Sequence, residues 1–286
     1  MAHVALPYIH VNGAESHQVS VLDRGFTYGD GLFETCLFKN GEIKLWAYHQ
    51  SRLLESANRL AIPLDLVRLN QQLIQFLEQL IVHQITSAVI KITVTRGEGG
   101  RGYGVPVQVN PTFVIAAFDA PAYPIENFRE GVAVKVCNTR LSKNPHLAGL
   151  KHLNRLEQIL ARSEWQSEYA EGICLDVDGL VVEGVFSNLF WGDKQGKLFT
   201  PNLHYAGVKG VMRSKVFDAC EQSFGIKPVE TFAGIDELLN AEEIFMTNSL
   251  YGIWPVKSVQ VQDTIFQFPS SKLVKKIQTV LDGEFA

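Results

Sequence analysis

The segment Asn144-Pro-His-Leu-Ala-Gly-Leu-Lys151-His-Leu-Asn-Arg-Leu-Glu157 joins a rigid turn to a stretch with helical periodicity. Pro145 fixes φ and excludes a helix at the turn, while Gly149 lets the backbone bend. Beyond the turn, apolar side chains recur at helical spacing: Leu153, Leu156, Ile159 and Leu160. This pattern predicts a helix over 152–169 and places Lys151 where that helix begins.

Lys151 is a candidate nucleophile. Its neighbours Leu147, Ala148 and Leu150 are apolar. A lysine that loses water can lose its charge and become a nucleophilic amine, as a Schiff base requires. The ordinary alternative is a solvated lysine, which this segment alone favours, so the rest of the chain has to distinguish the two.

Length and composition predict a globular protein with two domains. The 286 residues are 46% hydrophobic and 20% charged, enough apolar material for a sizeable core. A net charge of −4 and an isoelectric point of about 6.1 give no overall attraction to nucleic acid or anionic membrane. The longest apolar runs are strand-sized, and the N-terminus lacks the pattern of a secretory signal. We therefore expect a cytoplasmic protein without nucleic-acid or membrane partners.

The four cysteines are far apart in the sequence and form no C-x-x-C pair: Cys36, Cys137, Cys174 and Cys220. A disulfide framework or a zinc site is not expected from this spacing, and no metal is predicted. The cysteines are predicted to be small buried side chains in a reducing compartment.

The apolar pattern predicts an α+β fold, with a smaller N-terminal α/β domain over 1–118 and a larger domain over 126–286. In the first half, the strand candidates are 3–10, 31–38, 86–95 and 111–118, and the helix candidates are 46–61 and 65–84. Residues 119–125 contain two prolines and predict a short, stiff linker.

The second half is richer in strands. Asp178-Gly179, within 175–183, predicts a hairpin with a type I′ turn. Further strands are predicted near 132–137, 187–192, 227–231, 243–247 and 253–261, in a twisted, partly closed sheet. Helices are predicted near 152–169, 210–224 and 270–281.

Two glycine-rich segments are candidate ligand sites. Asp23–Glu34 has glycines at 25, 29 and 31, which predicts a tight loop that another group approaches closely, although a structural turn is the favoured alternative. It does not match a Walker or Rossmann motif. Gly207–Arg213 precedes a helical pattern, so its free amides could bind an anion, or the glycine could simply cap the helix.

Charged residues add three more candidates. Arg52 lies three residues after His49 on one helix face and could bind phosphate, although an ion pair is the commoner role. Arg96, Arg101 and Tyr103 lie where a strand enters a glycine-rich loop, which suits a substrate carboxylate as well as a solvated surface loop. Glu183 ends an apolar strand and could meet solvent or stabilise the protonated ring nitrogen of pyridoxal phosphate.

Together these candidates supply an amine, a phosphate-binding group, an acid and arginines for a substrate. The motifs that unite them are D-R-G-F-T-Y-G-D-G-L-F-E-T, R-G-E-G-G-R-G-Y, N-P-H-L-A-G-L-K-H-L-N-R-L-E-Q, E-G-V-F-S-N-L-F and A-G-V-K-G-V-M-R. Through them the chain resembles, almost from end to end, the fold-type IV enzymes that depend on pyridoxal 5′-phosphate, a family that includes branched-chain and D-amino-acid aminotransferases. Y-G-D-G is shared across this family, whereas G-G-R-G-Y and the N-P-H-L segment are typical of its aminodeoxychorismate lyase branch.

The resemblance implies a D-amino-acid aminotransferase-like fold with a barrel-like sheet in the larger domain. It implies that Lys151 holds pyridoxal 5′-phosphate as a Schiff base and later moves the proton, and that Glu183 pairs with the pyridine nitrogen. The implied phosphate ligands are Arg52, the backbone amides of Val211 and Met212, and Thr247-Asn248-Ser249. The implied substrate-facing residues are Arg101, Tyr103 and Arg96, with Tyr28 near the cofactor.

The same resemblance implies a homodimeric lyase of folate biosynthesis, which converts 4-amino-4-deoxychorismate into 4-aminobenzoate and pyruvate. A D-amino-acid or branched-chain aminotransferase shares the first chemical steps and nearly the same residues, among them Glu34 and Thr35 of L-F-E-T. A binding protein that reuses the scaffold without catalysis is a third hypothesis, against which the presence of Lys151 and Glu183 argues.

Overall fold

The computed structural model describes residues 6–269 and 272–281, and the chain folds into two compact units. Unit 1 is Met1–Pro121 together with Leu150–Asn154, and unit 2 is Ala122–Gly149 together with Arg155–Ala286. The chain first passes from unit 1 to unit 2 between Pro121 and Ala122, within the linker predicted over 119–125. Residues 150–154, which the prediction placed in the C-terminal domain over 126–286, belong to the compact unit of the N-terminal half.

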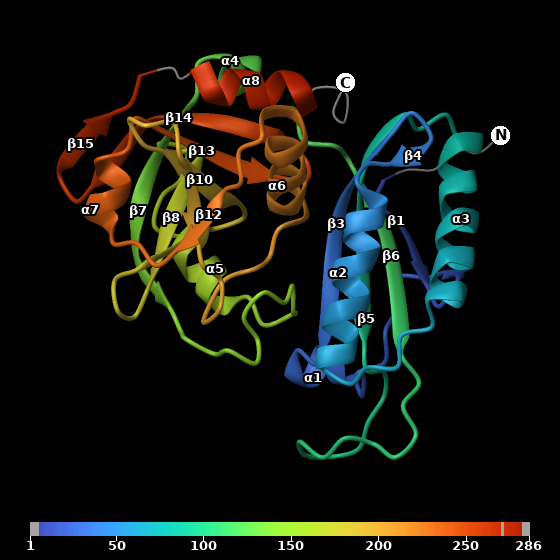
Figure 1. Cartoon of the computed structure of the whole chain (residues 1–286). Helices are drawn as coiled ribbons and strands as arrows, with labels where there is room; N and C mark the ends of the chain where they lie inside the picture. The colour runs from blue at the N-terminus through green and yellow to red at the C-terminus, as the bar shows by residue number, and fades with distance from the viewer. Residues whose placement is uncertain (1–5, 270–271, 282–286) are drawn as a thin grey trace. The chain divides into compact units, whose positions relative to one another are not determined.

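Unit 1 is an antiparallel sheet in the order β2-β1-β6-β5-β3-β4. Its strands are β1 (Tyr8–Val11), β2 (Ala14–Glu15), β3 (Gly31–Lys39), β4 (Glu42–Ile43), β5 (Ser87–Thr95) and β6 (Thr112–Phe118). Its helices are α1 (Arg24–Tyr28), α2 (Trp46–Arg59) and α3 (Leu66–Val82), all drawn in the blue to green part of Figure 1.

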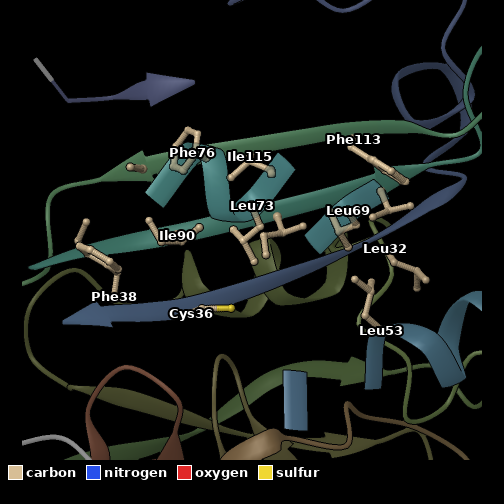
Figure 2. Packing of buried hydrophobic residues seen from close by; sticks show 14 of the residues in the cluster. Leu32, Cys36, Phe38, Leu53, Leu69, Leu73, Phe76, Ile90, Phe113 and Ile115 are labelled. Carbon is tan, nitrogen blue, oxygen red and sulfur yellow. The ribbon is translucent and has the colours of Figure 1, made fainter. Parts of the chain in front are cut away.

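One face of this sheet and two amphipathic helices enclose the core of unit 1. Alternate side chains of β3, β5 and β6 point to that face, because successive residues of a strand face opposite sides. They pack against the apolar stripes of α2 and α3, as Figure 2 shows for Phe38, Ile90, Leu53 and Leu73. The predicted helices 46–61 and 65–84 are confirmed to within two residues at each end.

The open edge of β3 is paired by two separate segments. At one end β4 pairs with it in a short hairpin. At the other end the amide of Phe33 donates to the carbonyl of Lys151 (2.9 Å), and the amide of Leu153 donates to the carbonyl of Gly31 (3.0 Å). Residues 151–153 therefore act as a short added strand, which is why Leu150–Asn154 belongs to unit 1.

Unit 2 contains a mixed sheet of nine strands that curls as a half-barrel. The strands are β7 (Val132–Leu141), β8 (Glu171–Asp176), β9 (Val181–Gly184), β10 (Asn188–Gly192), β11 (Leu198–Pro201), β12 (Val229–Thr231), β13 (Glu243–Asn248), β14 (Gly252–Val261) and β15 (Thr264–Gln267). The helices are α4 (Ile125–Arg129), α5 (Leu156–Arg162), α6 (Val211–Phe224), α7 (Ile235–Leu239) and α8 (Lys272–Leu281). Helices α6 and α8 pack on each other and on β13 and β14, whereas α5 packs on β7 and β8 (Figure 1).

The helix predicted over 152–169 is much shorter than its apolar pattern suggested. It begins at Leu156, because residues 151–153 are committed to β3, and it ends at Arg162. The predicted apolar face is not a core face either: Leu156, Ile159 and Leu160 are 73%, 61% and 58% exposed. Lys151 consequently lies in extended backbone rather than at the start of a helix.

The hairpin between β8 and β9 is present, but its turn differs from the prediction. Of the two central residues, only Gly179 has a positive φ (+81°), whereas a type I′ turn needs both. The amides of Asp178 and Leu180 donate to the side chain of Asp176, each at 2.9 Å. This contact stabilises a three-residue loop, and the register shift between Cys174 and Leu175 accommodates the extra residue.

The remaining predicted strands and helices are present, but β1 begins at Tyr8, so residues 6 and 7 of the predicted strand 3–10 lie outside it, and β7 extends beyond the predicted end at 137 to Leu141. The predicted starts of the strand 3–10 and of the helix 270–281 include residues outside the described ranges. All four cysteines are buried and unpaired. The short elements β2, β4, β11, β15, α1, α4 and α7 were not predicted. Within residues 6–269 and 272–281, no helix combines the length and apolar character needed to cross a membrane.

Replacing Gly31 by Ala tests the close pairing at the β3 edge. An added Cβ would lie 2.6 Å from the carbonyl oxygen of Val94 and 2.8 Å from Cδ1 of Leu153. We expect Gly31→Ala to lower the free energy of unfolding by about 2 kcal/mol, measured by urea denaturation. Gly100→Ala is the control, because no atom lies within 4 Å of its added Cβ. Equal stability of the two variants would contradict this description of the edge.

Candidate active site

Lys151 is held by its backbone at the edge of β3. Its carbonyl accepts the amide of Phe33, and its Nζ lies 4.4 Å from the centroid of the Phe33 ring. The aromatic face stabilises a cation and covers one side of the amine. Lys151 is half-buried, so this amine is ordered and partly removed from water.

A buried carboxylate lies on the same strand, paired with two residues of α2. The Nε of Arg52 donates to Oε1 of Glu34 at 2.9 Å, and its Nη2 donates to Oε2. The Nδ1 of His49 lies 2.6 Å from the same Oε2. Arg52 thus has the ion pair that the sequence favoured, and its partner is Glu34.

These contacts fix the protonation of the cluster. Burial raises the pKa of Glu34, but the Arg52 guanidinium and the His49 hydrogen bond overcome this and lower it to about 2. Burial lowers the pKa of His49, and the nearby charges of Arg52 and Lys151 add to this, against the raising effect of Glu34. Because an ionised carboxylate only accepts, Nδ1 of neutral His49 carries the hydrogen, and its buried Nε2 is an acceptor with no hydrogen-bond partner within the described residues.

The glycine-rich segment Asp23–Glu34 folds as the short helix α1 followed by a tight turn. Asp23 accepts the amide of Gly25 at the start of the helix, and Gly29 ends it with a φ of +66°. The predicted close approach is confirmed, since an added Cβ on Gly29 would lie 2.5 Å from the side chain of Asn154. The turn then presents Asp30 beside the start of β3.

Asp30 binds two arginines and anchors the glycine-rich loop after β5. Its carboxylate accepts Nε of Arg24 at 2.8 Å and Nε of Arg96 at 2.7 Å. Arg96 also donates to Asp30 through Nη2 (3.0 Å) and to the carbonyls of Leu60 and Ala61, each at 2.8 Å. Arg96 is buried, and its hydrogen bonds to Asp30, Leu60 and Ala61 hold the base of the loop. Its role toward a substrate stays a prediction.

The tip of this loop carries the other two predicted substrate residues. Arg101 and Tyr103 are both exposed, Tyr103 at 87%. Tyr28 contacts the loop through its ring, 5.6 Å from that of Tyr103, and its hydroxyl accepts the amide of Gly102 at 3.1 Å. The structure therefore brings Tyr28 and Tyr103 together, next to the backbone of the loop that carries Arg101.

In unit 2, Glu183 is buried on β9 and oriented by a backbone amide. Its Oε2 accepts the amide of Val208 at 2.7 Å. Gly207, with a φ of +87°, allows this contact, because an added Cβ would lie 2.8 Å from Val182 and 3.2 Å from the carboxylate. The acid at the strand end is thus a fixed, buried carboxylate and not a solvated one.

Asn188 connects this acid to the start of α6. Its Nδ2 donates to the carbonyl of Val208 and its Oδ1 accepts the amide of Gly210, each at 2.9 Å. Gly210 precedes α6 without any side-chain cap, so the first amides of the helix, at Val211 and Met212, face outward from the helix end. Such an end attracts an anion.

The Thr247-Asn248-Ser249 segment ends β13, the strand that pairs with β10. The hydroxyl of Thr247 donates to the carbonyl of Asn188 at 3.4 Å. Asn248 donates to the carbonyl of Phe186 at 2.5 Å and accepts the amide of Leu250 at 2.7 Å. Unit 2 therefore collects Glu183, the α6 terminus and this segment around Asn188, while Ser249 follows directly, half-buried.

Several residues that organise the site were not predicted as site residues. Asn188 lies in the motif E-G-V-F-S-N-L-F. Its position, as a polar residue at the start of an apolar strand, could have identified it. Asp30 and the Glu34–His49 pair depend on contacts distant in sequence, so local pattern could not reveal them. Among the described residues, no group of three or more His, Cys, Asp or Glu side chains is arranged to hold a metal.

Comparison with known proteins gives a consistent result along nearly the whole chain. Residues 31–259 match the family described as amino-transferase class IV. Aminodeoxychorismate lyase of Vibrio harveyi is 38% identical over 271 residues, which are 94% of this chain and 97% of the relative. The crystal structure of 4-amino-4-deoxychorismate lyase from Pseudomonas aeruginosa superposes with a TM-score of 0.90 and 42% identity, over 96% of this chain and 98% of that one. D-alanine aminotransferase of Bacillus licheniformis is 30% identical over 93% of this chain and 91% of its own length.

The low pKa of Glu34 predicts how stability depends on pH. Its folded-state pKa of about 2 lies below the ordinary 4.5, so ionised Glu34 stabilises the fold by about 3 kcal/mol above pH 4.5. This stabilisation is lost as the pH falls toward 2. We expect the difference in unfolding free energy between wild type and Glu34→Gln to shrink by about 1 kcal/mol from pH 6.5 to 3.5, measured by urea denaturation.

The exposed Glu78 on α3 provides the control, since Glu78→Gln should change stability little at either pH. If the difference in unfolding free energy between wild type and Glu34→Gln is the same at pH 6.5 and at pH 3.5, Glu34 is not an ionised, paired carboxylate.

Proposed function

The chain belongs to the amino-transferase class IV family, and on that basis we propose that it is a lyase acting on 4-amino-4-deoxychorismate. The products would be 4-aminobenzoate and pyruvate. The observation that carries the proposal is the similarity, over at least 94% of the chain, to two proteins named for this activity. Its cofactor is pyridoxal 5′-phosphate, as in the rest of the family.

The described residues fit this cofactor. Gly207 and Gly210 let the backbone come close to Glu183 and Asn188, which fixes the acid beside the amides at the start of α6: an added Cβ on Gly210 would lie 2.0 Å from Oδ1 of Asn188. We assign the phosphate to Arg52, the amides of Val211 and Met212, and Thr247-Asn248-Ser249. Glu183 would hold the proton on the pyridine nitrogen, and Lys151 would bind the cofactor through its amine. When bound, pyridoxal phosphate supplies an electron-poor ring that stabilises negative charge beside the substrate nitrogen.

In the proposed elimination, Lys151 would act on the substrate proton. The substrate amine would take the place of the Lys151 amine. Lys151 would then remove the proton from the ring carbon that carries the substrate amine. The backbone of Lys151 is paired with β3, so its amine can move only a short distance. The amine would therefore stay close to the substrate proton that it removes. Loss of this proton and of the enolpyruvyl group, which leaves as pyruvate, makes the substrate ring aromatic. Aromatisation supplies much of the driving force.

Substrate carboxylates would be bound at the loop after β5. Arg101 and Tyr103 are the candidates, because both are exposed on a loop whose base is firmly anchored. A guanidinium can bind a carboxylate through two parallel hydrogen bonds, and a phenol can add a third. Tyr28, whose hydroxyl accepts the amide of Gly102, would orient this loop near the cofactor.

An aminotransferase is the second candidate function. The 30% identity with D-alanine aminotransferase supports it, as does the shared L-F-E-T motif with Glu34 and Thr35. A transaminase needs the same lysine, acid and phosphate site but returns the proton to the cofactor. Only product analysis distinguishes the two reactions.

We also propose that the enzyme is a cytoplasmic homodimer of folate biosynthesis. The exposed apolar side chains of α5, at Leu156, Ile159 and Leu160, support an interface, since apolar patches of this kind are typical of interaction surfaces. The four buried, unpaired cysteines are consistent with a reducing compartment.

Incubation with 4-amino-4-deoxychorismate tests the reaction. We expect equal amounts of 4-aminobenzoate and pyruvate, and no comparable turnover of D-alanine with 2-oxoglutarate assayed in parallel. The protein should carry an absorption band that borohydride abolishes. Lys151→Ala should lose the band and lower turnover by at least about 10³-fold, because no other group can replace the amine.

Transamination without lyase products would reject the proposed reaction in favour of the second candidate. A colourless protein that binds no pyridoxal phosphate would instead favour a binding protein without catalysis. Full turnover by Lys151→Ala would refute the assigned role of the lysine.

Sedimentation velocity tests the proposed dimer. We expect wild type to sediment as a dimer, and the double variant Ile159→Glu, Leu160→Glu to shift toward the monomer, because charges would be buried in an apolar interface. Val177→Glu is the control, as Val177 is equally exposed (61%) but lies in the hairpin loop. A monomeric wild type, or an unchanged double variant, would contradict an interface at α5.

A further inference from the structure

Glu34 interrupts an apolar stripe on β3. The other alternate side chains of the strand, Leu32, Cys36 and Phe38, are buried in the core of unit 1 (Figure 2). Glu34 faces the same side with only 1% of its surface exposed. A charge at such a position is strongly unfavourable without close partners, whereas an apolar residue would complete the stripe. Packing alone therefore does not account for a carboxylate here.

The partners of Glu34 hold it from two successive positions of one helix face. His49 and Arg52 are three residues apart on α2, so both reach the same carboxylate. Arg52 pairs side-on with both oxygens, a geometry that fixes the plane of the guanidinium. His49 binds Oε2 as well, which prevents the carboxylate from turning about its own axis.

We propose that Glu34 and His49 are positioning residues that hold the Arg52 guanidinium in the one orientation in which it binds the phosphate of the cofactor. The inference rests on the proposed function, in which Arg52 is a phosphate ligand. Of the five N–H groups of a guanidinium, Glu34 accepts two, on the edge formed by Nε and Nη2. The orientation of the other edges follows from this pairing, so Glu34 sets the direction in which Arg52 can bind a second anion.

The negative charge of Glu34 would weaken phosphate binding, whereas its positioning of Arg52 would strengthen phosphate binding. Glu34 is an anion close to a phosphate-binding arginine, so its field opposes phosphate binding. If only charge mattered, a neutral residue at position 34 would strengthen phosphate binding. If orientation dominates, the same change would weaken it, because a long arginine side chain without a partner samples many rotamers. The sign of the effect thus distinguishes positioning from charge.

The test compares pyridoxal 5′-phosphate with pyridoxal, which lacks only the phosphate. Both are titrated into the full-length protein freed of cofactor, and the ratio of the two dissociation constants gives the phosphate preference. Glu34→Gln and His49→Leu should each lower this preference about tenfold relative to wild type. His49→Asn, whose amide N–H can replace that of Nδ1, should stay within about threefold of wild type. Arg52→Ala should lose most of the preference.

Cys36→Ala is the matched control for a general effect on the core. It removes buried volume from the next position of the same stripe but leaves Glu34, His49 and Arg52 unchanged. A merely structural role would weaken binding of both ligands equally in Glu34→Gln and Cys36→Ala, and so leave the preference unchanged.

A preference in Glu34→Gln or His49→Leu that equals or exceeds that of wild type overturns the inference. If Glu34→Gln does not fold, the contrast between His49→Leu and His49→Asn decides it alone. A wild type that binds the two ligands equally refutes the phosphate site and the inference with it. A wild type that prefers the phosphate but makes no 4-aminobenzoate contradicts only the proposed reaction, and the variant ratios still support or overturn the role of Glu34 and His49.

Discussion

The backbone pairing between residues 151–153 and the open edge of β3 is the constraint on which the arrangement of the site depends. A lysine on a flexible loop would lose its orientation to side-chain and backbone motion, whereas Lys151 is held by a sheet with a packed core behind it. The chain is also held just before this strand, since Gly149 donates to the carbonyl of Gly207 and accepts the amide of Lys209. Lys151 can therefore move at its side chain while its backbone stays fixed, which suits the attachment and release proposed for its amine.

This constraint explains where local sequence reasoning succeeded and where it failed. The helices α2 and α3 and the strands β3, β5 and β6 follow from apolar periodicity, because each buries one face against its neighbours. Helix α5 does not, since its apolar side chains at Leu156 and Ile159 are exposed. Periodicity reports which side chains avoid water, but it does not say whether this chain or another surface covers them. The pairing of 151–153 with β3 joins residues more than a hundred positions apart, and no local pattern contains that information.

The same distinction holds for the candidate site. Lys151, Glu183 and the α6 terminus were recognised from motifs, and the structure gives each a defined setting: an edge strand, a buried carboxylate and an uncapped helix end. What the motifs could not assign was the partner of each charge. Arg52 and Arg96 were both predicted as ligands, and the structure adds that their guanidinium groups pair with Glu34 and Asp30. An arginine motif shows that a planar cation is needed, and only tertiary contacts show which anion it meets.

The pairs that Asp30 forms with Arg24 and Arg96 explain how the glycine-rich loop after β5 is held within unit 1. Asp30 holds Arg96 at the base of the loop after β5, and Arg24, also bound to Asp30, donates to the carbonyls of Gly102 and Gly104, each at 3.2 Å. The base is thus rigid, while the tip with Arg101 stays exposed. A rigid base and an exposed tip let the tip change without disturbing the pairing of Lys151 with β3 or the ion pair of Arg52 with Glu34. With the substrate bound at the tip, as proposed above, substrate choice would vary at this loop while Lys151 and Arg52 keep their settings.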